Sequence, residues 1–355
     1  MAVQRMDLLR KLVLLFSVIF FLFFLFAIIL RFFFAGQGTE TIVVPKNMAP
    51  VRSFISPVKV SKGWFNHLAV VKDSHVIYAN GLGLLAGSER SLYKSNDEGK
   101  TWVPMMTPLA TSISAVNEQL VYVGSLEQGM GKTQDGGNTW FPTGLGRSEV
   151  IQVQAVDADT VYAIITDQYV INGGSLYKTN DGGMHWNEIY SSNWSAPVTL
   201  YAASKKTVYV GLKRGLISNG QILKTTDGGA SWSIVYVGQA NTHFKQIYAV
   251  DENIVFVATS TGIVKTLDGG KSWYSCTNNL PTSFENKGYG FTGIYAIDAQ
   301  TAYVSYSFPY SVYVTHDGGG YWQNINMGAS VNVLSGFGNT IYVGTQLALF
   351  VLKDQ

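Results

Sequence analysis

Two short apolar runs recur as a pair seven times along the chain, and the second run of each pair has an aromatic residue at its centre. The first runs read HLAVV, ISAVN, VQAVD, LYAAS, IYAVD, IYAID and VNVLS. The aromatic residues lie 39 to 47 residues apart, at Tyr78, Tyr122, Tyr162, Tyr209, Phe256, Tyr303 and Tyr342. Small and β-branched residues favour tightly packed strands, and a spacing of about 40 residues is typical of four-stranded propeller blades. The pattern predicts an all-β fold with seven inner strand pairs.

A polar ten-residue segment follows six of the seven pairs. Its copies are YKSNDEGKTW, GKTQDGGNTW, YKTNDGGMHW, LKTTDGGASW, VKTLDGGKSW and YVTHDGGGYW. Each copy predicts a strand, a tight turn whose glycines adopt positive φ, and the start of another strand. The carboxylate can accept N–H groups inside the turn, and the tryptophan can pack on a neighbouring unit. We therefore assign structural roles to Asp97, Asp135, Asp181, Asp227, Asp268 and Asp317, and to Trp102, Trp140, Trp186, Trp232, Trp273 and Trp322.

The seventh repeat is unfinished. After Tyr342, the segment Leu349 to Asp354 aligns with Leu92 to Asp97, and the sequence then stops before a fourth strand. The segment Val51 to Val60 precedes the first inner strand and has no blade of its own. We expect it to pair with the strand that ends at Lys353 and to close the ring, because closure removes two open sheet edges.

The pattern Ser/Thr-x-Asp-x-Gly-x-x-Trp resembles the Asp-box of sialidase-type (BNR) β-propellers. The spelling LYKTNDGG, with an upstream VYVG, is similar to the branch that includes the photosystem II stability/assembly factors. The resemblance extends from about residue 64 to residue 355. It implies a propeller fold, but Asp-box propellers include glycosidases, sorting receptors, lectins and assembly factors, so the fold alone does not assign a function.

The amino terminus predicts a membrane anchor. Residues Leu12 to Leu30 are 19 consecutive residues without a charge, and RFFFAG continues the apolar run. Such a helix nearly matches a hydrocarbon core of roughly 30 Å. Arg5, Arg10 and Lys11 place the preceding end in the cytoplasm. We expect a cytoplasmic tail (1–11), an uncleaved transmembrane anchor (12–34), a linker (35–50) and a propeller (51–355) on the periplasmic or extracellular side of a plasma or bacterial inner membrane.

Composition narrows the chemistry. Lys and Arg total 25 against 23 for Asp and Glu, so the chain has no basic field that would indicate a nucleic-acid partner. The single cysteine, Cys276, excludes an intrachain disulfide and a four-cysteine metal site. The five histidines show no metal-ligand spacing. We predict neither a metal nor a cofactor.

Loop length indicates where partners bind. With the strands of a blade named a to d from the axis outward, the Asp turns join c to d and share a face with the short a–b turns. The longer segments, Gly81–Arg90, Thr166–Ser175, Tyr190–Pro197, Gly211–Gly220, Tyr236–Lys245, Ser275–Gly290 and Ser305–Ser311, lie on the other face. The candidate binding residues there are Tyr169, Trp194, Arg214, His243, Phe244, Phe284, Glu285, Tyr289, Tyr306, Phe308 and Tyr310.

The first functional hypothesis is a non-catalytic scaffold that holds another envelope or membrane protein on this face. Exposed aromatic residues with a few polar groups suit a protein surface. By resemblance, the assembly-factor branch implies a chaperone-like role for a membrane complex. The arginine-rich patch associated with that branch is not evident in this sequence, which argues against a photosystem client.

The alternative is a glycan-binding protein or a glycoside hydrolase. A sialidase needs three arginines around a carboxylate, but beyond the linker the chain has only Arg52, Arg90, Arg147 and Arg214. Other glycosidases need two facing carboxylates. The obvious candidates near the long loops are Glu127, Glu149, Asp167 and Glu285, and no spacing selects a pair.

Overall fold

The structure is a computed structural model that describes residues 56–82, 91–105, 110–126, 128–166, 173–214, 219–240, 242–281, 290–308 and 310–354. The chain divides into the units Met1–Ile42 and Val43–Gln355, and every described residue belongs to the second. The predicted tail, anchor and linker lie outside the described residues. Within the described ranges, no helix has the length and apolar character needed to cross a membrane.

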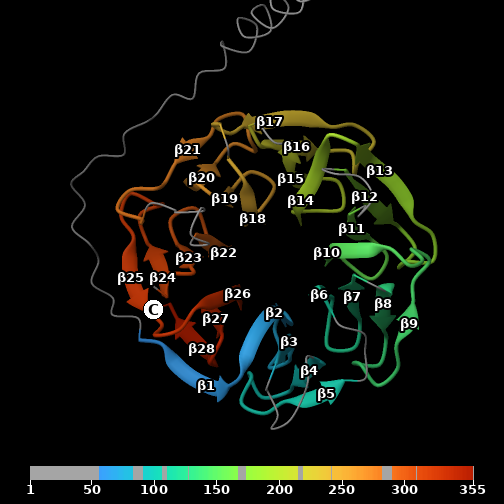
Figure 1. Ribbon diagram of the computed structural model, residues 1–355, viewed down its shortest axis with the longest axis horizontal. Coiled ribbons are helices and arrows are strands. Elements are labelled where there is room, and N and C mark those ends of the chain that lie inside the picture. Colours follow the sequence, from blue (N-terminus) through green and yellow to red (C-terminus); the bar gives the residue numbers. More distant parts are fainter. Residues whose placement is uncertain are drawn as a thin grey trace, which may run out of the picture. The chain divides into compact units, whose positions relative to one another are not determined.

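Seven four-stranded antiparallel sheets surround a common axis as the blades of a propeller (Figure 1). This confirms the predicted all-β fold and the predicted number of blades. Blade 1 comprises β2 (Trp64–Val70), β3 (Ile77–Leu82), β4 (Ser91–Ser95) and β5 (Val103–Met105). Blade 2 comprises β6 (Ser112–Ala115), β7 (Val121–Ser125), β8 (Gly129–Thr133) and β9 (Phe141–Pro142). Blade 3 comprises β10 (Glu149–Ala155), β11 (Val161–Thr166), β12 (Gly174–Thr179) and β13 (Asn187–Ser192).

The remaining blades repeat this order from the axis outward. Blade 4 comprises β14 (Ser195–Ala202), β15 (Val208–Arg214), β16 (Gln221–Thr225) and β17 (Ser233–Val237). Blade 5 comprises β18 (Phe244–Ala249), β19 (Val255–Thr259), β20 (Gly262–Thr266) and β21 (Tyr274–Ser275). Blade 6 comprises β22 (Phe291–Ala296), β23 (Ala302–Tyr306), β24 (Ser311–Thr315) and β25 (Gln323–Asn326). Blade 7 comprises β26 (Val331–Phe337), β27 (Thr340–Thr345), β28 (Ala348–Lys353) and β1 (Val58–Lys62).

Blade 7 joins the two ends of the described chain, as the sequence predicted. β1 pairs antiparallel with β28, so that Val58 lies opposite Val351 and Lys62 lies opposite Ala348. The strand begins later than the predicted segment Val51–Val60, of which residues 51–55 lie outside the described part. Pro57 explains the late start, because proline has no N–H group to donate to the ladder.

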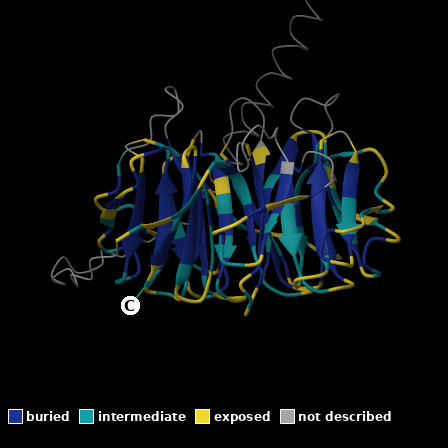
Figure 2. Cartoon of the chain, turned by 90° about the horizontal axis from the view of Figure 1, so that it is seen from below, coloured by how far each residue is buried: buried dark blue, intermediate teal, exposed yellow. Residues whose placement is uncertain are grey.

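The hydrophobic core lies between adjacent blades. Phe65 and Tyr93 of blade 1, for example, share a cluster with Tyr342 and Leu349 of blade 7. Each sheet is therefore covered on both sides, and Figure 2 shows strands that are buried along most of their length, with exposed residues gathered at the turns. Burial on both sides explains why strands b are continuous apolar runs rather than alternating ones.

Polar side chains connect neighbouring inner strands. The Leu200 N–H donates to Gln152 Oε1 and the Gln152 amide donates back to the Leu200 carbonyl, both at 3.0 Å. The Ile294 N–H likewise donates to Gln246 Oε1 at 2.9 Å. The inner edge of each innermost strand has no neighbouring strand to pair with. These side-chain bonds occupy backbone groups on that edge and so reduce the free-energy cost of unpaired N–H and C=O groups.

Candidate functional site

The two faces of the ring differ in the connections they carry. In blade 1, the Glu98 N–H of the c–d turn donates to the His75 carbonyl of the a–b turn, and in blade 3 Gly182 donates to the Asp159 carbonyl. Turns a–b and c–d therefore share one face, which we call the Asp-turn face. The b–c and d–a connections lie at the opposite ends of the strands, which we call the loop face. The predicted separation of the two faces is confirmed.

The six aspartates of the repeated segment lie in the c–d turns, where hydrogen bonds occupy their carboxylates. In blade 3, Thr179 Oγ1 donates to Asp181 Oδ1 at 2.7 Å and accepts the Gly183 N–H, while the His185 N–H donates to Asp181 Oδ1 at 2.9 Å. Gly182 and Gly183 adopt φ of 67° and 94°. The first turn has Glu98 at a φ of 60° in place of a glycine. The carboxylates thus hold these turns in shape.

The pKa values of four of these carboxyl groups fit that structural role. Partial burial raises the pKa of Asp97, but hydrogen bonds from the Thr101 hydroxyl and N–H and from Ser95 outweigh it and lower the pKa to about 2. Hydrogen bonds lower the pKa of Asp135, Asp181 and Asp227 below the usual range as well. Such groups remain ionised at neutral pH and do not act as general acids.

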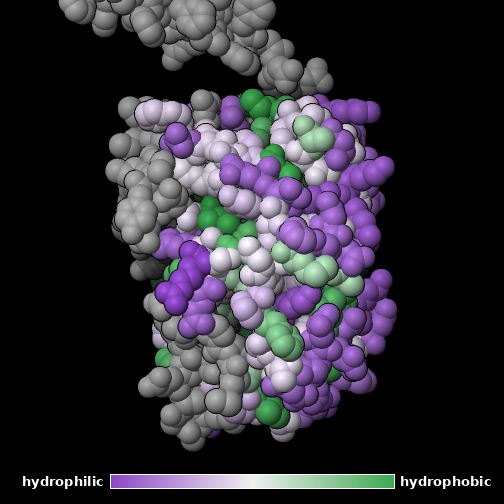
Figure 3. All heavy atoms as spheres, turned by 90° about the vertical axis from the view of Figure 1, so that its right-hand side faces the viewer, coloured by the Kyte–Doolittle hydropathy of each residue, from purple (hydrophilic) through white to green (hydrophobic). Residues whose placement is uncertain are grey.

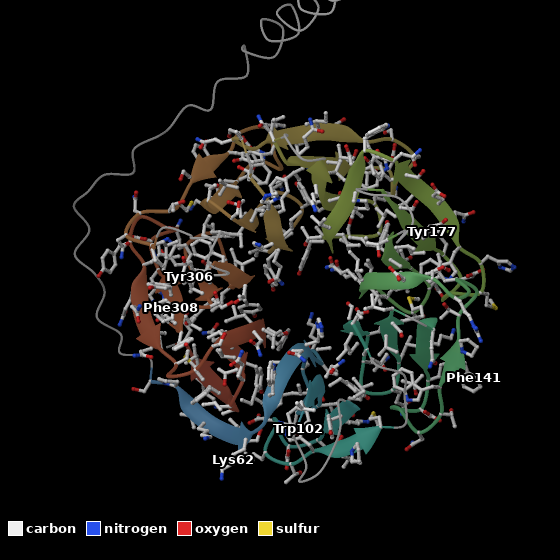
Figure 4. All side chains as sticks on the ribbon, viewed as in Figure 1. Lys62, Trp102, Phe141, Tyr177, Tyr306 and Phe308 are labelled. Carbon is white, nitrogen blue, oxygen red and sulfur yellow. The ribbon has the colours of Figure 1, made fainter. Side chains whose placement is uncertain are left out.

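Three of the tryptophans that end these segments donate a hydrogen bond to the preceding blade. Trp322 Nε1 donates to the Cys276 carbonyl of blade 5 at 2.7 Å, and Trp232 Nε1 donates to the Ile189 carbonyl of blade 3 at 2.9 Å. Trp102 donates to Ser61 Oγ of the closing strand at 3.1 Å, and Figure 4 shows it near the Lys62 end of that strand. These three tryptophans connect one blade to the next, whereas Trp140 and Trp186 donate to glycine carbonyls of their own turns.

Lysine and tyrosine side chains reach forward in the opposite direction. Lys224 Nζ donates to the Gly269 carbonyl and Tyr209 donates to the Glu252 carbonyl, both at 2.8 Å. The ammonium group also lies 5.1 Å from the centre of the Tyr209 ring. Lys94, Lys132, Lys178 and Lys265 contact glycine carbonyls of the following Asp turns in the same way. Each of these Asp turns is thus held by side chains from the blade before it.

Among the described residues of the loop face, Trp194 has the most exposed large side chain. It lies between β13 and β14 and is 81% exposed. The Ser192 hydroxyl accepts the N–H groups of Trp194 and Ser195 at 3.2 and 3.1 Å, which fixes the turn beneath the ring. This connection is only two residues long, shorter than the predicted loop Tyr190–Pro197, because β13 and β14 extend into it. A large aromatic ring on a short, hydrogen-bonded turn loses little conformational freedom if it is bound.

A second aromatic group lies at the loop-face end of blade 6. Phe308 is 46% exposed and Tyr310 is 40% exposed, and their rings meet edge to face with centroids 5.3 Å apart. Tyr310 adopts a φ of 55°, and its carbonyl accepts the Met327 N–H at 2.8 Å. Phe291 and Tyr306 pack in the same blade with centroids 5.0 Å apart. The exposed pair therefore lies in the same blade as a buried aromatic pair, and Figure 4 labels Tyr306 and Phe308 there.

Two predicted binding residues are core residues instead. Phe244 is 5% exposed and packs where Gly211 and Gly220 of blade 4 have no side chains. Tyr306 is 1% exposed and shares a cluster with Phe291 and Leu280. Their assignment to the binding surface was wrong, because the neighbouring residues cover them.

The other predicted residues divide into two groups. His243 is half-buried in the connection before β18. The backbone of Arg214 ends β15, and its side chain lies outside the described atoms. Four further candidates lie outside the described residues, namely Tyr169, Phe284, Glu285 and Tyr289.

Short turns of the loop face expose apolar side chains that the sequence analysis missed. Leu347, in the turn between β27 and β28, is 63% exposed, and Leu126 and Leu82 are also exposed. The sequence analysis selected residues from the longer connections only and so did not include these leucines. An apolar residue inside a two-residue turn was the sequence signal that could have identified Leu347. By contrast, the side of the ring seen in Figure 3 is mainly hydrophilic, with small separate apolar patches.

Three tyrosines of the inner strands form a further cluster that the sequence analysis did not identify. Tyr201, Tyr248 and Tyr295 come from three consecutive blades, and their ring centroids are 4.9 and 5.1 Å apart. Tyr295 donates to the Gly338 carbonyl at 3.0 Å, and burial raises its pKa to about 12. The recurring YA at this position of the inner strands was the sequence signal. Neutral tyrosines that pack on one another are suited to holding neighbouring blades together rather than to acting as nucleophiles.

Catalytic and metal-binding groups are sparse in the described part of the chain. Glu149 is the only acidic residue that the described loop face carries, and Thr166 Oγ1 lies 3.3 Å from its Oε2. The other carboxylate candidates, Glu127, Asp167 and Glu285, lie outside the description. Among the described residues, no group of three or more His, Cys, Asp or Glu side chains could hold a metal. Burial raises the pKa of the Cys276 thiol to about 11, which makes it unreactive.

Comparison with known proteins supports the fold. No family model and no curated protein matches the sequence. Among solved structures, YCF48 bound to a D1 peptide is similar, with 14% identity, a TM-score of 0.62, and coverage of 86% of this chain and 97% of that chain. YCF48 from Cyanidioschyzon merolae shows 16% identity, a TM-score of 0.59, and coverage of 84% and 97%.

A glycoside hydrolase shares the architecture to a similar degree. The GH74 xyloglucanase from Xanthomonas campestris shows 13% identity and a TM-score of 0.58. The match covers 84% of this chain and 53% of that longer chain. Identities this low show a common seven-bladed propeller architecture and do not transfer an activity.

Proposed function

We propose that this protein is a membrane-anchored, non-catalytic scaffold whose loop face binds another envelope or membrane protein. The observation that carries the proposal is the presence of Trp194 and of the Phe308–Tyr310 pair on one face, each on a turn held by hydrogen bonds. Exposed aromatic rings on rigid turns are the residue types that dominate protein interfaces. The anchor over residues 12–34 belongs to the proposal as a sequence-based expectation.

The spacing of the aromatic sites favours a protein partner over a small ligand. β13 and β14, which flank Trp194, lie across the ring from β23 and β24, which flank Phe308 and Tyr310 (Figure 1). A partner that contacts both sites must span the face. The structural neighbour YCF48 is known with a bound D1 peptide, so a similar architecture supports protein recognition in that case.

Partner capture by the full-length chain from a detergent extract of its source membrane tests the proposal. We expect wild type to retain a defined protein, and we expect Trp194→Ala and Phe308→Ala each to reduce its recovery roughly tenfold, as loss of an interface hot spot does. Phe141→Ala is the matched control, because Phe141 is an exposed aromatic residue on the outer strand β9 (Figure 4). Equal recovery by all four proteins would argue against the loop face as the binding surface.

The second candidate function is glycan recognition or hydrolysis on the same face. Trp194 supports it, because an exposed indole ring can stack on a sugar, and the GH74 neighbour is an enzyme of that class. Glycan-array binding lost in Trp194→Ala, or hydrolysis lost in Glu149→Gln or Glu285→Gln, would favour this function. Retention of a protein partner without any glycan signal would favour the scaffold.

A further inference from the structure

The Asp-turn face is acidic around the axis. The seven a–b turns are all described, and they carry the acidic residues Asp73, Glu118, Asp157, Asp159, Asp251, Glu252 and Asp298. The same turns carry three lysines, Lys72, Lys205 and Lys206, and no arginine. Lys205 is paired with Asp157, so its charge is already compensated. This face therefore repels an anionic surface.

The loop face has the opposite character. Its described strand ends and connections expose four basic side chains, Lys62, Arg147, Lys213 and Lys245, with Glu149 as the described acidic residue. In sequence, the segments outside the description that join these strands add Arg90 and Lys287, together with Glu89, Glu127, Asp167 and Glu285. The described part of this face thus exposes four basic side chains and carries one acidic residue, whereas the a–b turns carry more acidic residues than basic ones.

Apolar and aromatic side chains lie among these basic groups. Trp194, Phe308, Tyr310, Leu126 and Leu347 are exposed on the same face and come from four different blades or blade junctions. A face that combines Trp and Tyr, aliphatic tips and basic stems is typical of proteins that rest in the headgroup region of a membrane. Because these side chains are distributed around the ring, they suit contact with a flat surface better than binding of a ligand in a single pocket.

The connection to the predicted anchor is long enough to let the loop face meet a membrane. β1 starts at the Asp-turn end, because Lys62, its last residue, lies opposite Ala348 at the loop-face end of β28. β28 has six residues and is roughly 20 Å long, which sets the height of the blade. Residues 35–57 could span up to roughly 75 Å when extended. That length exceeds the height of a blade, so the length of the connection does not decide which face meets the bilayer.

We infer that the loop face lies against an anionic lipid bilayer, with the acidic Asp-turn face directed away from it. Trp194, Leu347 and the Phe308–Tyr310 pair would enter the headgroup region, and Lys62, Arg147, Lys213 and Lys245 would neutralise lipid phosphates. A propeller in this orientation presents its loop face to proteins embedded in the same membrane. The inference rests on the membrane anchor of the proposed function, but it concerns lipid contact and is tested separately from the proposed protein partner.

Tryptophan quenching by brominated phosphatidylcholine tests the orientation. The full-length chain is reconstituted in nanodiscs of phosphatidylcholine with and without phosphatidylglycerol. The fluorescence difference between wild type and Trp194→Phe isolates the Trp194 signal. We expect the brominated lipid to remove most of that signal in discs that contain phosphatidylglycerol. In the matched probe variant, Trp194→Phe combined with Met184→Trp, the new indole lies on the Asp-turn face and should remain unquenched, since Met184 is exposed there.

Charge reversal provides the second measurement. The pair Lys213→Glu and Lys245→Glu should abolish the added quenching caused by phosphatidylglycerol. The pair Lys205→Glu and Lys206→Glu changes the same number of charges on the opposite face and should leave it intact. Equal quenching at positions 194 and 184, no response to phosphatidylglycerol, or no association with the discs would each overturn the inference.

Partner capture in detergent separates the two conclusions. If Trp194 stays unquenched while Trp194→Ala loses its partner in detergent, the face binds protein only and the lipid inference is wrong. If Trp194 is quenched and no variant changes partner recovery, lipid contact holds and the proposed function is wrong.

Discussion

Asp97 and its equivalents combine a surface position with a full set of hydrogen bonds. Asp97 Oδ1 accepts the Thr101 N–H at 2.9 Å and the Ser95 hydroxyl at 2.7 Å, and Oδ2 accepts the Thr101 hydroxyl at 2.6 Å. Every donor comes from the same turn. The residue types of the repeated segment therefore specify the turn locally, whichever blade surrounds it.

Acid should weaken these turns. Burial raises the pKa of Asp97 and Asp268, but hydrogen bonds lower both from 3.8 to about 2. A pKa lowered in the folded state gives stability that is present above the unfolded value and lost as the pH falls through the folded value. We expect the melting temperature to fall as the pH is lowered from about 4 to about 2. Asp97→Asn should show a shallower fall than wild type, and identical pH profiles would contradict the assignment.

Trp322 links blades 5 and 6. It is fully buried, packs near Cys276, and donates to that residue's carbonyl. Trp322→Ala should lower the free energy of unfolding by about 3–5 kcal/mol, since it leaves a large cavity between two sheets. Trp140→Ala is the comparison, because Trp140 is only half-buried and donates within its own turn at 3.1 Å. Urea denaturation of both variants measures the difference, and equal losses would contradict the assigned role.

At the scale of elements, β1 is the strand on which ring closure depends. Its register with β28 is interrupted by a bulge between Lys59 and Ser61, and Ser61 accepts the Trp102 indole N–H. The Gly63 N–H donates to the Leu347 carbonyl at 3.0 Å. β1 thus joins blade 7 to blade 1 by a ladder, a side-chain bond and a turn.

Deletion of Val58–Lys62 should open the ring. The edge of β28 and the indole of Trp102 would become exposed, and an unpaired strand edge promotes aggregation. We expect loss of soluble protein in detergent or a markedly lower melting temperature. The control replaces residues 36–50 with a Gly/Ser segment of equal length and should behave like wild type. Wild-type stability in the deletion would count against closure by β1.

At the scale of the whole molecule, the sequence predicted which turns lie on which face of the ring, but it did not predict which side chains are exposed there. Antiparallel order alone places every c–d turn on one face, so seven repeats were sufficient to separate the faces. Exposure depends on residues distant in sequence: Phe244 is buried beside Gly211 and Gly220, whereas Trp194 has no such cover. The residues that form the recognition surface are therefore determined by the tertiary structure.

The sequence by itself determined the number of blades, the Asp turns and the closing strand, because these follow from local hydrogen bonds and from a fixed repeat length. Only the tertiary structure decided which aromatic residues face solvent, since neighbouring blades cover Tyr306 and Phe244 and leave Trp194 and Phe308 exposed. It also brought Tyr201, Tyr248 and Tyr295 together from three blades. Burial of a side chain depends on its packed neighbours, and packing between blades joins residues that belong to different repeats of the sequence.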